Sequence, residues 1–334
     1  MTQAWLLFQL AGCAVLIARA GYVLSRSADA LADTYGWGRG WVGLALLATV
    51  TSLPELASGL SAVAIVGAPN LAIGNSLGAC VVNLLFLVVV DALQRDQPMY
   101  REASATHLLS AGFGVVMLGF VAMSLLTGTR APIVLHIGIY SPILLALYLL
   151  ALKSVHGHEC EAMAARAATP NPASAAQTRR EWRRFALAAL VVLAAGAWLP
   201  EVADDLANAM GLSRSFVGTV LMAVVTTLPE MAVTLGALRV GALDMAIGNL
   251  LGSNLFNVMI LALDDAFYVR GPLLADAAPV HAGTAVSALV MTGLVIIGLV
   301  MRPQGRPLRV LSWVSVALVA TYAVNAALVY LGGT

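Results

Sequence analysis

Long apolar runs, separated by short polar or glycine- and proline-containing breaks, make up most of the 334-residue chain. A helix needs about 20 apolar residues to cross the hydrocarbon core of a bilayer. The runs that reach this length predict ten transmembrane helices, at roughly 4–33, 41–66, 70–93, 106–126, 132–152, 185–209, 216–239, 244–264, 280–301 and 309–331. With 60% hydrophobic and 10% charged residues and a mean hydropathy of +0.89, the composition excludes a soluble globular protein. The predicted fold class is an all-α polytopic membrane protein.

Two stretches of the chain are copies of one another. Val42–Ala57 and Val217–Ala232 agree at 10 of 16 positions at a constant offset of 175 (217 − 42). Each leads into a second matching stretch, Ala72–Leu93 and Ala246–Phe267, at an offset of 174 (246 − 72). The chain is therefore expected to be a duplicated five-helix unit. Because five is odd, the second copy must enter the membrane upside down, and such inverted repeats are typical of secondary transporters.

The repeats divide the chain into three parts. The first five-helix repeat covers 1–152, with its duplicated motif segment at about 41–93, and the second covers 185–334, with its motif segment at about 216–267. Residues 153–184 between them are rich in Ala, Pro, Ser and Arg. We expect this segment to be a cytoplasmic linker that is too short for a further domain.

The Lys and Arg residues predict the orientation in the membrane. If the N-terminus is outside, thirteen of the 18 fall in cytoplasmic loops, three in outer loops and two within the first helix. This bias predicts a multi-pass protein of the cell inner membrane, with both termini outside and the 153–184 loop in the cytoplasm. The first residues lack the basic segment of a cleaved signal peptide. A net charge of +1, without a basic and aromatic patch, gives no reason to expect nucleic acid as a partner.

The residues shared by the two copies are polar, although they lie within apolar runs. Glu55 and Glu230 are ionisable at membrane depth, which marks a functional site. Pro54 and Pro229 precede them and lack a backbone N–H, so each frees a carbonyl one turn earlier that a cation can bind. Hydroxyl groups lie one turn before each carboxylate or next to that position: Thr51, Ser52, Thr226 and Thr227.

The companion helix of each copy carries one narrow polar stripe. It falls at i, i+4 and i+8 and comprises Asn75, Ala79 and Asn83 in the first copy and Asn249, Ser253 and Asn257 in the second. Glycines at small-xxx-small spacing, Gly74 with Gly78 and Gly248 with Gly252, are expected to let other helices approach closely. Carboxylates, hydroxyls and amides with no His or thiolate in register suit calcium or sodium better than zinc or copper.

Other polar positions carry weaker signals. The segment His156–Cys160 (HGHEC) could hold a soft metal, but a solvated linker is the simpler interpretation. Asp91, Asp264 and Asp265 end the third and eighth predicted helices, where a solvated mouth is expected rather than coordination. The polar end of the first helix, Ser25–Asp33, either lies in the membrane interface or belongs to a mobile pair formed by the first and sixth helices.

The motifs resemble those of a known family. TSLPE at Thr51–Glu55, TTLPE at Thr226–Glu230, and GN-x-x-G-(S/A)-x-x-x-N at Gly74–Asn83 and Gly248–Asn257 are similar to the repeats of the calcium/cation antiporter superfamily, nearest to its prokaryotic sodium/calcium exchangers. The resemblance implies a secondary-active antiporter that exchanges calcium or another divalent cation against sodium by alternating access at a midplane site built on two Glu. Calcium and sodium are then transported substrates, and no cofactor is implied. Carried over residue by residue, the metal ligands are Thr51, Ser52, Glu55, Asn83, Thr226, Thr227, Glu230, Ser253 and Asn257.

The chain departs from the family pattern at several positions. Ala79–Cys80 stands where the family has Ser-Asn, so one sodium-coordinating hydroxyl is missing. Asn83 and Asn257 end both motifs, where many relatives have one Asp, and this counts against potassium dependence. Leu77 and Leu251 lie where the proton-coupled branch has an acidic residue. A site charge of −2 therefore predicts fewer sodium ions per cycle than in better-known relatives, or coupling to another cation.

Three alternatives remain at this point. A divalent cation antiporter coupled to protons or another cation would use the same oxygens. An intramembrane enzyme needs asymmetric acid and base roles, whereas the two half-sites are near copies. A channel needs a continuous pore, commonly built by several subunits. The expected partners are calcium and sodium ions and the lipid bilayer, and the single chain is expected to be functional as a monomer.

Overall fold

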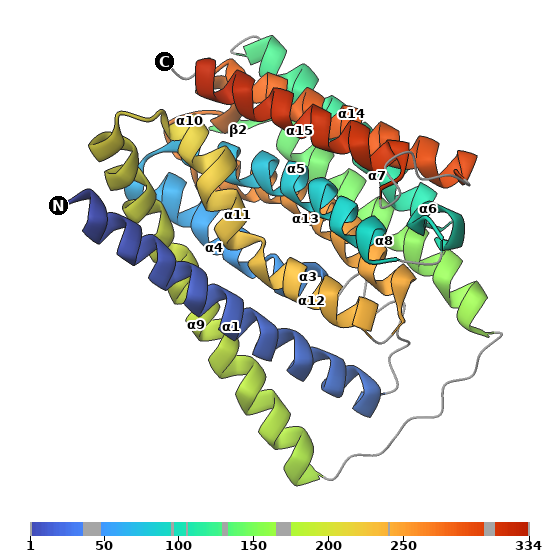
Figure 1. Ribbon diagram of the computed structural model, residues 1–334. Coiled ribbons are helices and arrows are strands. Elements are labelled where there is room, and N and C mark those ends of the chain that lie inside the picture. Colours follow the sequence, from blue (N-terminus) through green and yellow to red (C-terminus); the bar gives the residue numbers. More distant parts are fainter. Residues whose placement is uncertain are drawn as a thin grey trace.

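The computed structural model describes residues 2–35, 48–94, 97–104, 106–128, 133–164, 175–239, 241–303 and 311–332. Almost all of them are helical, and Figure 1 shows their arrangement. In chain order the elements are α1 (Gln3–Tyr35), α3 (Ala48–Thr51), α4 (Leu53–Ser61), the π-helix η2 (Ala62–Val66), α5 (Pro69–Leu93), α6 (Met99–Glu102), α7 (His107–Thr127), β1 (Ile133–Val134), β2 (Ile137–Gly138), α8 (Tyr140–Ala164), α9 (Ala175–Met210), α10 (Arg214–Phe216), the π-helix η4 (Val217–Met222), α11 (Ala223–Thr226), α12 (Leu228–Arg239), α13 (Leu243–Phe267), the 3₁₀-helix η5 (Leu273–Ala275), α14 (Val280–Met301) and α15 (Trp313–Leu331).

Seven helices in the described part of the chain are long and apolar enough to cross a membrane. An eighth span results if the helices on either side of the 41° bend between Thr226 and Leu228 are counted together. Two shorter apolar helices cover Leu53–Val66 and Tyr140–Val155. These segments fall where the sequence predicts transmembrane helices, although residues 41–47 of the predicted second helix lie outside the described residues. The protein is thus an α-helical membrane protein.

Two predicted segments differ from the structure. The predicted helix at 132–152 begins with a small antiparallel hairpin, in which Ile133 pairs with Gly138, and the helix starts only at Tyr140. The predicted linker at 153–184 is helical at both ends, because α8 continues to Ala164 and α9 starts at Ala175. The reason is local: these flanks together are rich in Ala, Glu and Arg, which favour helix, and a helix can continue beyond the bilayer.

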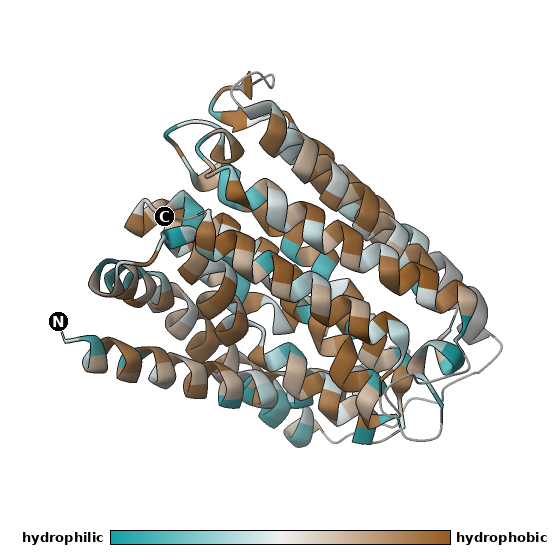
Figure 2. Ribbon diagram, turned by 45° about the horizontal axis from the view of Figure 1, so that its top comes forward, coloured by the Kyte–Doolittle hydropathy of each residue, from teal (hydrophilic) through white to brown (hydrophobic). Residues whose placement is uncertain are grey.

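Two helices, α5 and α13, form the centre of the molecule. The most apolar 18-residue window of α13 is 94% buried and that of α5 is 67% buried, against 28% for α1 and α15. Helices α1 and α9 lie side by side on one flank, and α14 and α15 lie on the other (Figure 1). Hydrophobic residues predominate along the helices (Figure 2), as expected for a surface in contact with lipid.

The three aspartates predicted to form a solvated mouth are fully buried instead. Asp265 accepts hydrogen bonds from the backbone of Gly138 and Leu273 and from the hydroxyls of Tyr140 and Ser141. Its counterpart Asp91 (265 − 174) accepts bonds from Met99 N, Ser312 N and the Ser315 hydroxyl. Buried carboxylates with these hydrogen bonds hold the ends of neighbouring helices in place. The sequence position of an aspartate at the end of a helix does not reveal this role.

These two aspartates, called the anchors below, accept hydrogen bonds from equivalent donors, two of which lie in the opposite repeat and one in the same repeat. Adding 174 to 99, 138 and 141 gives 273, 312 and 315, so three donors of Asp91 correspond to three donors of Asp265. Each aspartate binds the start of a helix from the other half: Asp91 on α5 fastens α15, and Asp265 on α13 fastens α8. The halves are therefore interlocked rather than laid end to end.

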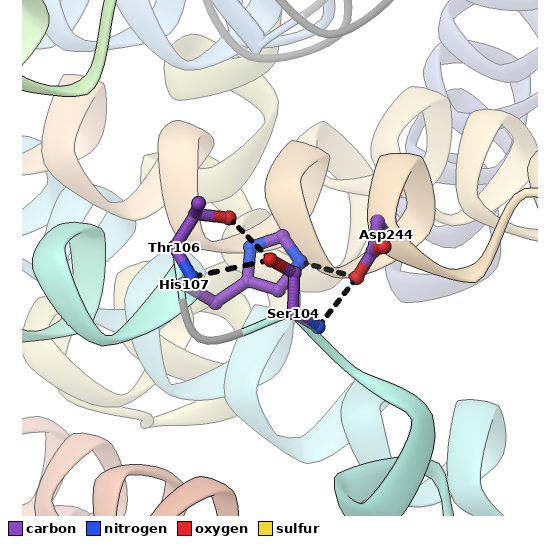
Figure 3. A network of polar contacts seen from close by, with 4 residues as sticks. All are labelled: Ser104, Thr106, His107 and Asp244. Atoms are coloured by element: carbon purple, nitrogen blue, oxygen red, sulfur yellow. Dashed lines mark hydrogen bonds and ion pairs between the residues drawn. The ribbon is translucent and has the colours of Figure 1, made fainter. Parts of the chain in front are cut away.

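A second pair of equivalent contacts joins α13 to α7 and α5 to the segment before α14. The Asp244 carboxylate accepts from Ser104 N at 2.8 Å and lies 3.0 Å from His107 Nε2, as Figure 3 shows. At the matching place, Asn70 Oδ1 accepts from Ala278 N at 2.7 Å. The backbone contact is thus kept in both copies, whereas the ion pair is possible in only one because Asn70 replaces the aspartate.

Candidate cation-binding site

Both Thr-x-Leu-Pro-Glu segments interrupt a helix. Ser52, with φ −88° and ψ 11°, separates α3 from α4, and Thr227, with φ −81° and ψ 2°, separates α11 from α12. The cause is the proline two residues later, which cannot donate to the carbonyl four residues before it. Because each Glu follows its proline directly, both carboxylates lie in the first turn after a break.

The two half-sites meet. Glu55 and Glu230 are both fully buried, and their charges are close enough to interact. Ser52 of the first half donates its hydroxyl to Glu230 Oε1 of the second at 2.7 Å. The Thr226 hydroxyl neighbours the Glu55 carboxylate, and those of Thr51 and Ser253 neighbour Glu230. Ser52 of the first copy and Glu230 of the second are therefore in direct contact.

The α5 stripe supports this place from one side. Asn75 Nδ2 donates to Ser58 Oγ at 2.8 Å, and Asn75 Oδ1 accepts from Thr226 Oγ1 at 3.1 Å. Asn75 thus ties the helix after the first break to the helix before the second. Gly78 lets α5 approach η4 closely, because a Cβ at position 78 would lie 2.3 Å from the Thr219 carbonyl oxygen.

Equivalent residues of α5 and α13 meet where the two helices cross. Asn254 Nδ2 donates to the Cys80 carbonyl at 3.2 Å, and the Cys80 thiol points to the Asn254 carbonyl at 3.7 Å. Positions 80 and 254 differ by the repeat offset of 174, so this contact lies on the axis that relates the copies. Asn83 Nδ2 donates to Asn254 Oδ1 at 3.1 Å. Sequence reasoning did not assign Asn254 or Ser58 to the site, although Asn254 follows Ser253 directly in the recognised motif.

Several buried oxygens of the two Glu and of the α5 and α13 stripes lack a hydrogen-bond partner among the described residues. They are both carboxylate oxygens of Glu55, Glu230 Oε2, Asn83 Oδ1, Asn249 Oδ1, Ser253 Oγ and Asn257 Oδ1. Every one of these side chains has zero exposure. Buried polar groups are ordinarily paired, and leaving them unpaired costs about 1–3 kcal/mol each, more for a charge. A concentration of unpaired oxygens with two carboxylates is suited to holding hard cations.

The remaining predicted ligands use their hydroxyl hydrogens inside their own helices. Thr51 Oγ1 donates to the Ala48 carbonyl at 3.3 Å and Thr227 Oγ1 donates to that of Ala223 at 2.8 Å. A hydroxyl that donates its hydrogen keeps two lone pairs, so these oxygens can still bind a cation. The side chains of His156–Cys160 lie outside the part of the chain that the structure describes, so the possible soft-metal site there stays a prediction.

Comparisons with known proteins agree with this fold. The family profile of the sodium/calcium exchanger proteins matches residues 5–153 and 182–331. The fold is similar to that of the sodium-calcium exchanger NCX_Mj soaked with 2.5 mM Na⁺ and 10 mM Sr²⁺, with a TM-score of 0.66 at 20% identity over 98% of this chain and 99% of that one. The same exchanger soaked with zero Na⁺ and Ca²⁺ gives a TM-score of 0.60 at 21% identity over 96% and 98% of the two chains.

Relatives with curated names point the same way. The candidate antiporter CaxA of Alkalimonas amylolytica is 30% identical over 244 residues, which are 71% of this chain and 72% of CaxA. The inner membrane protein YrbG of Escherichia coli is 26% identical over 70% of this chain and 71% of its own length. The sodium/calcium exchanger MaX1 of Methanosarcina acetivorans is 44% identical over 63 residues, 19% of this chain and 18% of MaX1. From the profile match over both halves of the chain, the protein belongs to the sodium/calcium exchanger family of membrane cation antiporters.

Proposed function

We propose that this protein is a secondary-active antiporter that exchanges calcium, or another divalent cation, against sodium at one buried site built on Glu55 and Glu230. The observation that carries the proposal is that both carboxylates are fully buried and that only one of their four oxygens, Glu230 Oε1, accepts a hydrogen bond from a described residue, Ser52 of the other repeat. The ligand set is Thr51, Ser52, Glu55, Asn83, Thr226, Thr227, Glu230, Ser253 and Asn257.

Charge explains why two kinds of cation compete for such a site. Two ionised carboxylates carry −2, which one calcium or two sodium ions neutralise. In a space without water, an unbalanced charge costs several kcal/mol, on the order expected for a buried ion. The site is therefore more stable with one calcium ion or two sodium ions bound than when empty. Exchange follows if the protein switches between its outward-open and inward-open states only when ions are bound.

Alternating access is supported by the two-fold arrangement of contacts. Positions related by an offset of 174 or 175 make equivalent contacts in opposite halves, as Asp91 and Asp265 do. We infer ten transmembrane helices in two inverted repeats, 1–152 and 185–334, joined by a cytoplasmic segment at 153–184. The membrane is the cell inner membrane, and both termini face outward.

Proton coupling is the second candidate, because Ala79 deletes one hydroxyl and leaves the α5 stripe poorer in sodium ligands. An enzyme is the weaker alternative: the family consists of transporters, and each half-site supplies the same Thr, Pro and Glu, so no division into acid and base is built in.

The experiment is isotope flux in proteoliposomes that contain the purified protein. Calcium loaded inside should leave when sodium is added outside and should stay when sodium is replaced by choline. A proton gradient without sodium tests the second candidate directly. Calcium release that needs no cation on the opposite side would indicate a channel, and absence of any cation-driven flux would remove the proposal.

A further inference from the structure

Asp264 is a buried carboxylate that neither the anchors nor the two-Glu site uses. It has zero exposure, and neither of its oxygens has a hydrogen-bond partner among the described residues. Its neighbour Asp265, equally buried, accepts four hydrogen bonds from described donors. The contrast between the two adjacent aspartates shows that Asp264, unlike Asp265, does not hold a neighbouring helix in place through hydrogen bonds to described residues.

Asp264 lies on the polar face of α13. It comes seven residues after Asn257 and eleven after Ser253, and at 100° per residue both spacings return to within about 20° of the same face. Along the helix it is about 10 Å beyond Asn257 at 1.5 Å rise per residue. The stripe of oxygen ligands thus continues past the two-Glu site towards the C-terminal end of α13.

The side chain of Asp264 also faces the helix that carries Glu55. A Cβ at Gly59 of α4 would lie 2.5 Å from Asp264 Oδ2 and 2.7 Å from Oδ1, so the carboxylate occupies the space that a larger residue at 59 would fill. Gly59 is four residues after Glu55, one turn further along the same face. Asp264 is therefore placed between α4 and α13, next in line after the two-Glu site.

The repeat gives no structural reason for this carboxylate. Its counterpart in the first copy is Val90 (264 − 174), which is also buried and apolar. A valine suffices at the equivalent place between equivalent helices. The carboxylate is present in one half of the molecule only, so any role it has in moving ions applies to one side of the two-Glu site and not to the other.

An ionised carboxylate in this position needs a positive charge. Burying a lone charge costs far more than burying a neutral or paired group, so the side chain holds either a metal ion or a proton. The ionisable groups near it are Asp265 on its own helix, Glu55 one turn before Gly59 on α4, and His136, whose Nε2 lies 3.0 Å from the Ala266 carbonyl oxygen. Arg270 is directed to Gly67, where a Cβ would lie 3.1 Å from its Nη2, and makes no hydrogen bond to Asp264 in the described structure.

We propose that Asp264 is a separate binding station for one small monovalent cation, sodium or a proton, on the path between the two-Glu site and the C-terminal end of α13. The station rests on the proposed exchange function. It raises the negative charge of the transport unit from −2 to −3. The sequence analysis counted two carboxylates at the site and from them predicted fewer sodium ions per cycle. That count is then incomplete, because Asp264 was expected to be solvated.

The test compares Asp264→Asn and Asp264→Val, the residue of the first copy, with the unmodified protein in proteoliposomes. Asp205→Asn, an exposed carboxylate on α9, is the matched control and should behave as the unmodified protein. Three quantities are measured: the Hill slope of sodium-driven calcium release, its pH profile, and the net charge moved per calcium. We expect both Asp264 variants to change the net charge per calcium by about one elementary charge.

The other two readouts distinguish the cations. If the station takes sodium, the sodium Hill slope falls by about one at constant pH. If it takes a proton, the slope is kept and the pH profile of the unmodified protein flattens. If a folded Asp264 variant kept the sodium Hill slope, the pH profile and the net charge per calcium of the unmodified protein, the proposed binding station would be wrong.

A further variant covers failure of the Asp264 variants to fold. Gly59→Ala places a methyl group where the carboxylate lies and leaves the acid itself in the chain, so it should shift the same readouts in the same direction. Normal coupling in a folded Gly59→Ala protein would also overturn the inference. Absence of exchange in the unmodified protein would instead remove the proposed function, so the two failures are separable.

Discussion

At the scale of single residues, the proposed site is defined by buried oxygens that have no hydrogen-bond partner among the described residues. Glu55 has no hydrogen-bond partner on either carboxylate oxygen within the described residues, while Glu230 has one, the Ser52 hydroxyl. Such an arrangement is unfavourable in an empty protein and becomes favourable when a cation enters. The stability of the site and its affinity for ions are therefore linked.

The first prediction follows for the two carboxylates. Glu55→Gln and Glu230→Gln each remove one of two charges that balance a divalent ion, and breaking a buried charge pair costs about 3–5 kcal/mol. Calcium binding should weaken by roughly 100-fold or more, and calcium flux should be lost while the protein remains folded. Equilibrium binding and flux on purified protein measure this, with exposed Glu201→Gln as the control. Near-normal flux in either variant would show that the site is elsewhere.

At the scale of elements, the flanking pair α1 and α9 packs directly on the two helix breaks. A Cβ at Gly21 of α1 would lie 2.5 Å from Cγ of Pro229, and one at Gly196 of α9 would lie 3.0 Å from the Pro54 carbonyl oxygen. Positions 21 and 196 differ by 175, so each long helix contacts the break of the opposite repeat in the same way. A movement of this pair would pass directly over the residues that hold the site.

The second prediction uses these glycines. Gly21→Ala forces a methyl group into Pro229, and the backbone of either helix must shift to accommodate it. Calcium turnover should fall several-fold, with a smaller change in calcium affinity, because the ligands themselves are untouched. Gly12→Ala is the control: it is on the same helix, and a Cβ there meets no described atom within 4 Å. Equal turnover of the two variants would mean that α1 does not move against α12.

The third prediction concerns the anchors. Asp265→Ala leaves Gly138 N, Leu273 N and the Tyr140 and Ser141 hydroxyls without their acceptor, so the free energy of unfolding should fall by about 3 kcal/mol or more. Thermal unfolding in detergent measures the loss. Asp264→Ala, on the same helix and equally buried but without a hydrogen-bond partner among described residues, should not lower stability. Similar losses for both would indicate that burial alone, and not the hydrogen bonds, sets the effect.

These elements also show what the sequence can and cannot predict. The duplicated Thr-x-Leu-Pro-Glu segments and the α5 and α13 stripes are local patterns with a physical cause, so their positions and their convergence could be anticipated. The burial of Asp91, Asp264 and Asp265 could not, because it depends on residues that lie between 124 and 224 positions away along the chain. The helical ends of the 153–184 segment were missed for a different reason: the Pro and Ser residues of the segment as a whole favour a linker, whereas its ends carry Ala, Glu and Arg, which favour helix.

At the scale of the whole molecule, the halves are joined by exchanged contacts. Helix α15 is fastened to α5 of the first half by Asp91, and α8 is fastened to α13 of the second by Asp265. Helices α1 and α9 contact the breaks of the opposite halves as well. Neither repeat can therefore rearrange without the other, which is what a transporter needs if the two sides of the membrane are never open together.

The last prediction tests how this molecule lies in the membrane. Helix α9 runs from Ala175 to Met210, 36 residues or about 54 Å, so it is longer than the bilayer is thick, and in the proposed topology its two ends face opposite sides. The basic residues near its start predict that this end is cytoplasmic and that Met210 faces outward. In a background without the three native cysteines, Met210→Cys should react with a membrane-impermeant maleimide that is added to the outside of intact cells. Ala176→Cys should react only after the cells are permeabilised. Both positions are exposed, so access to the reagent and not burial decides the result. Labelling of Ala176→Cys alone from outside would reverse the topology, and with it the side on which Asp264 would meet its cation.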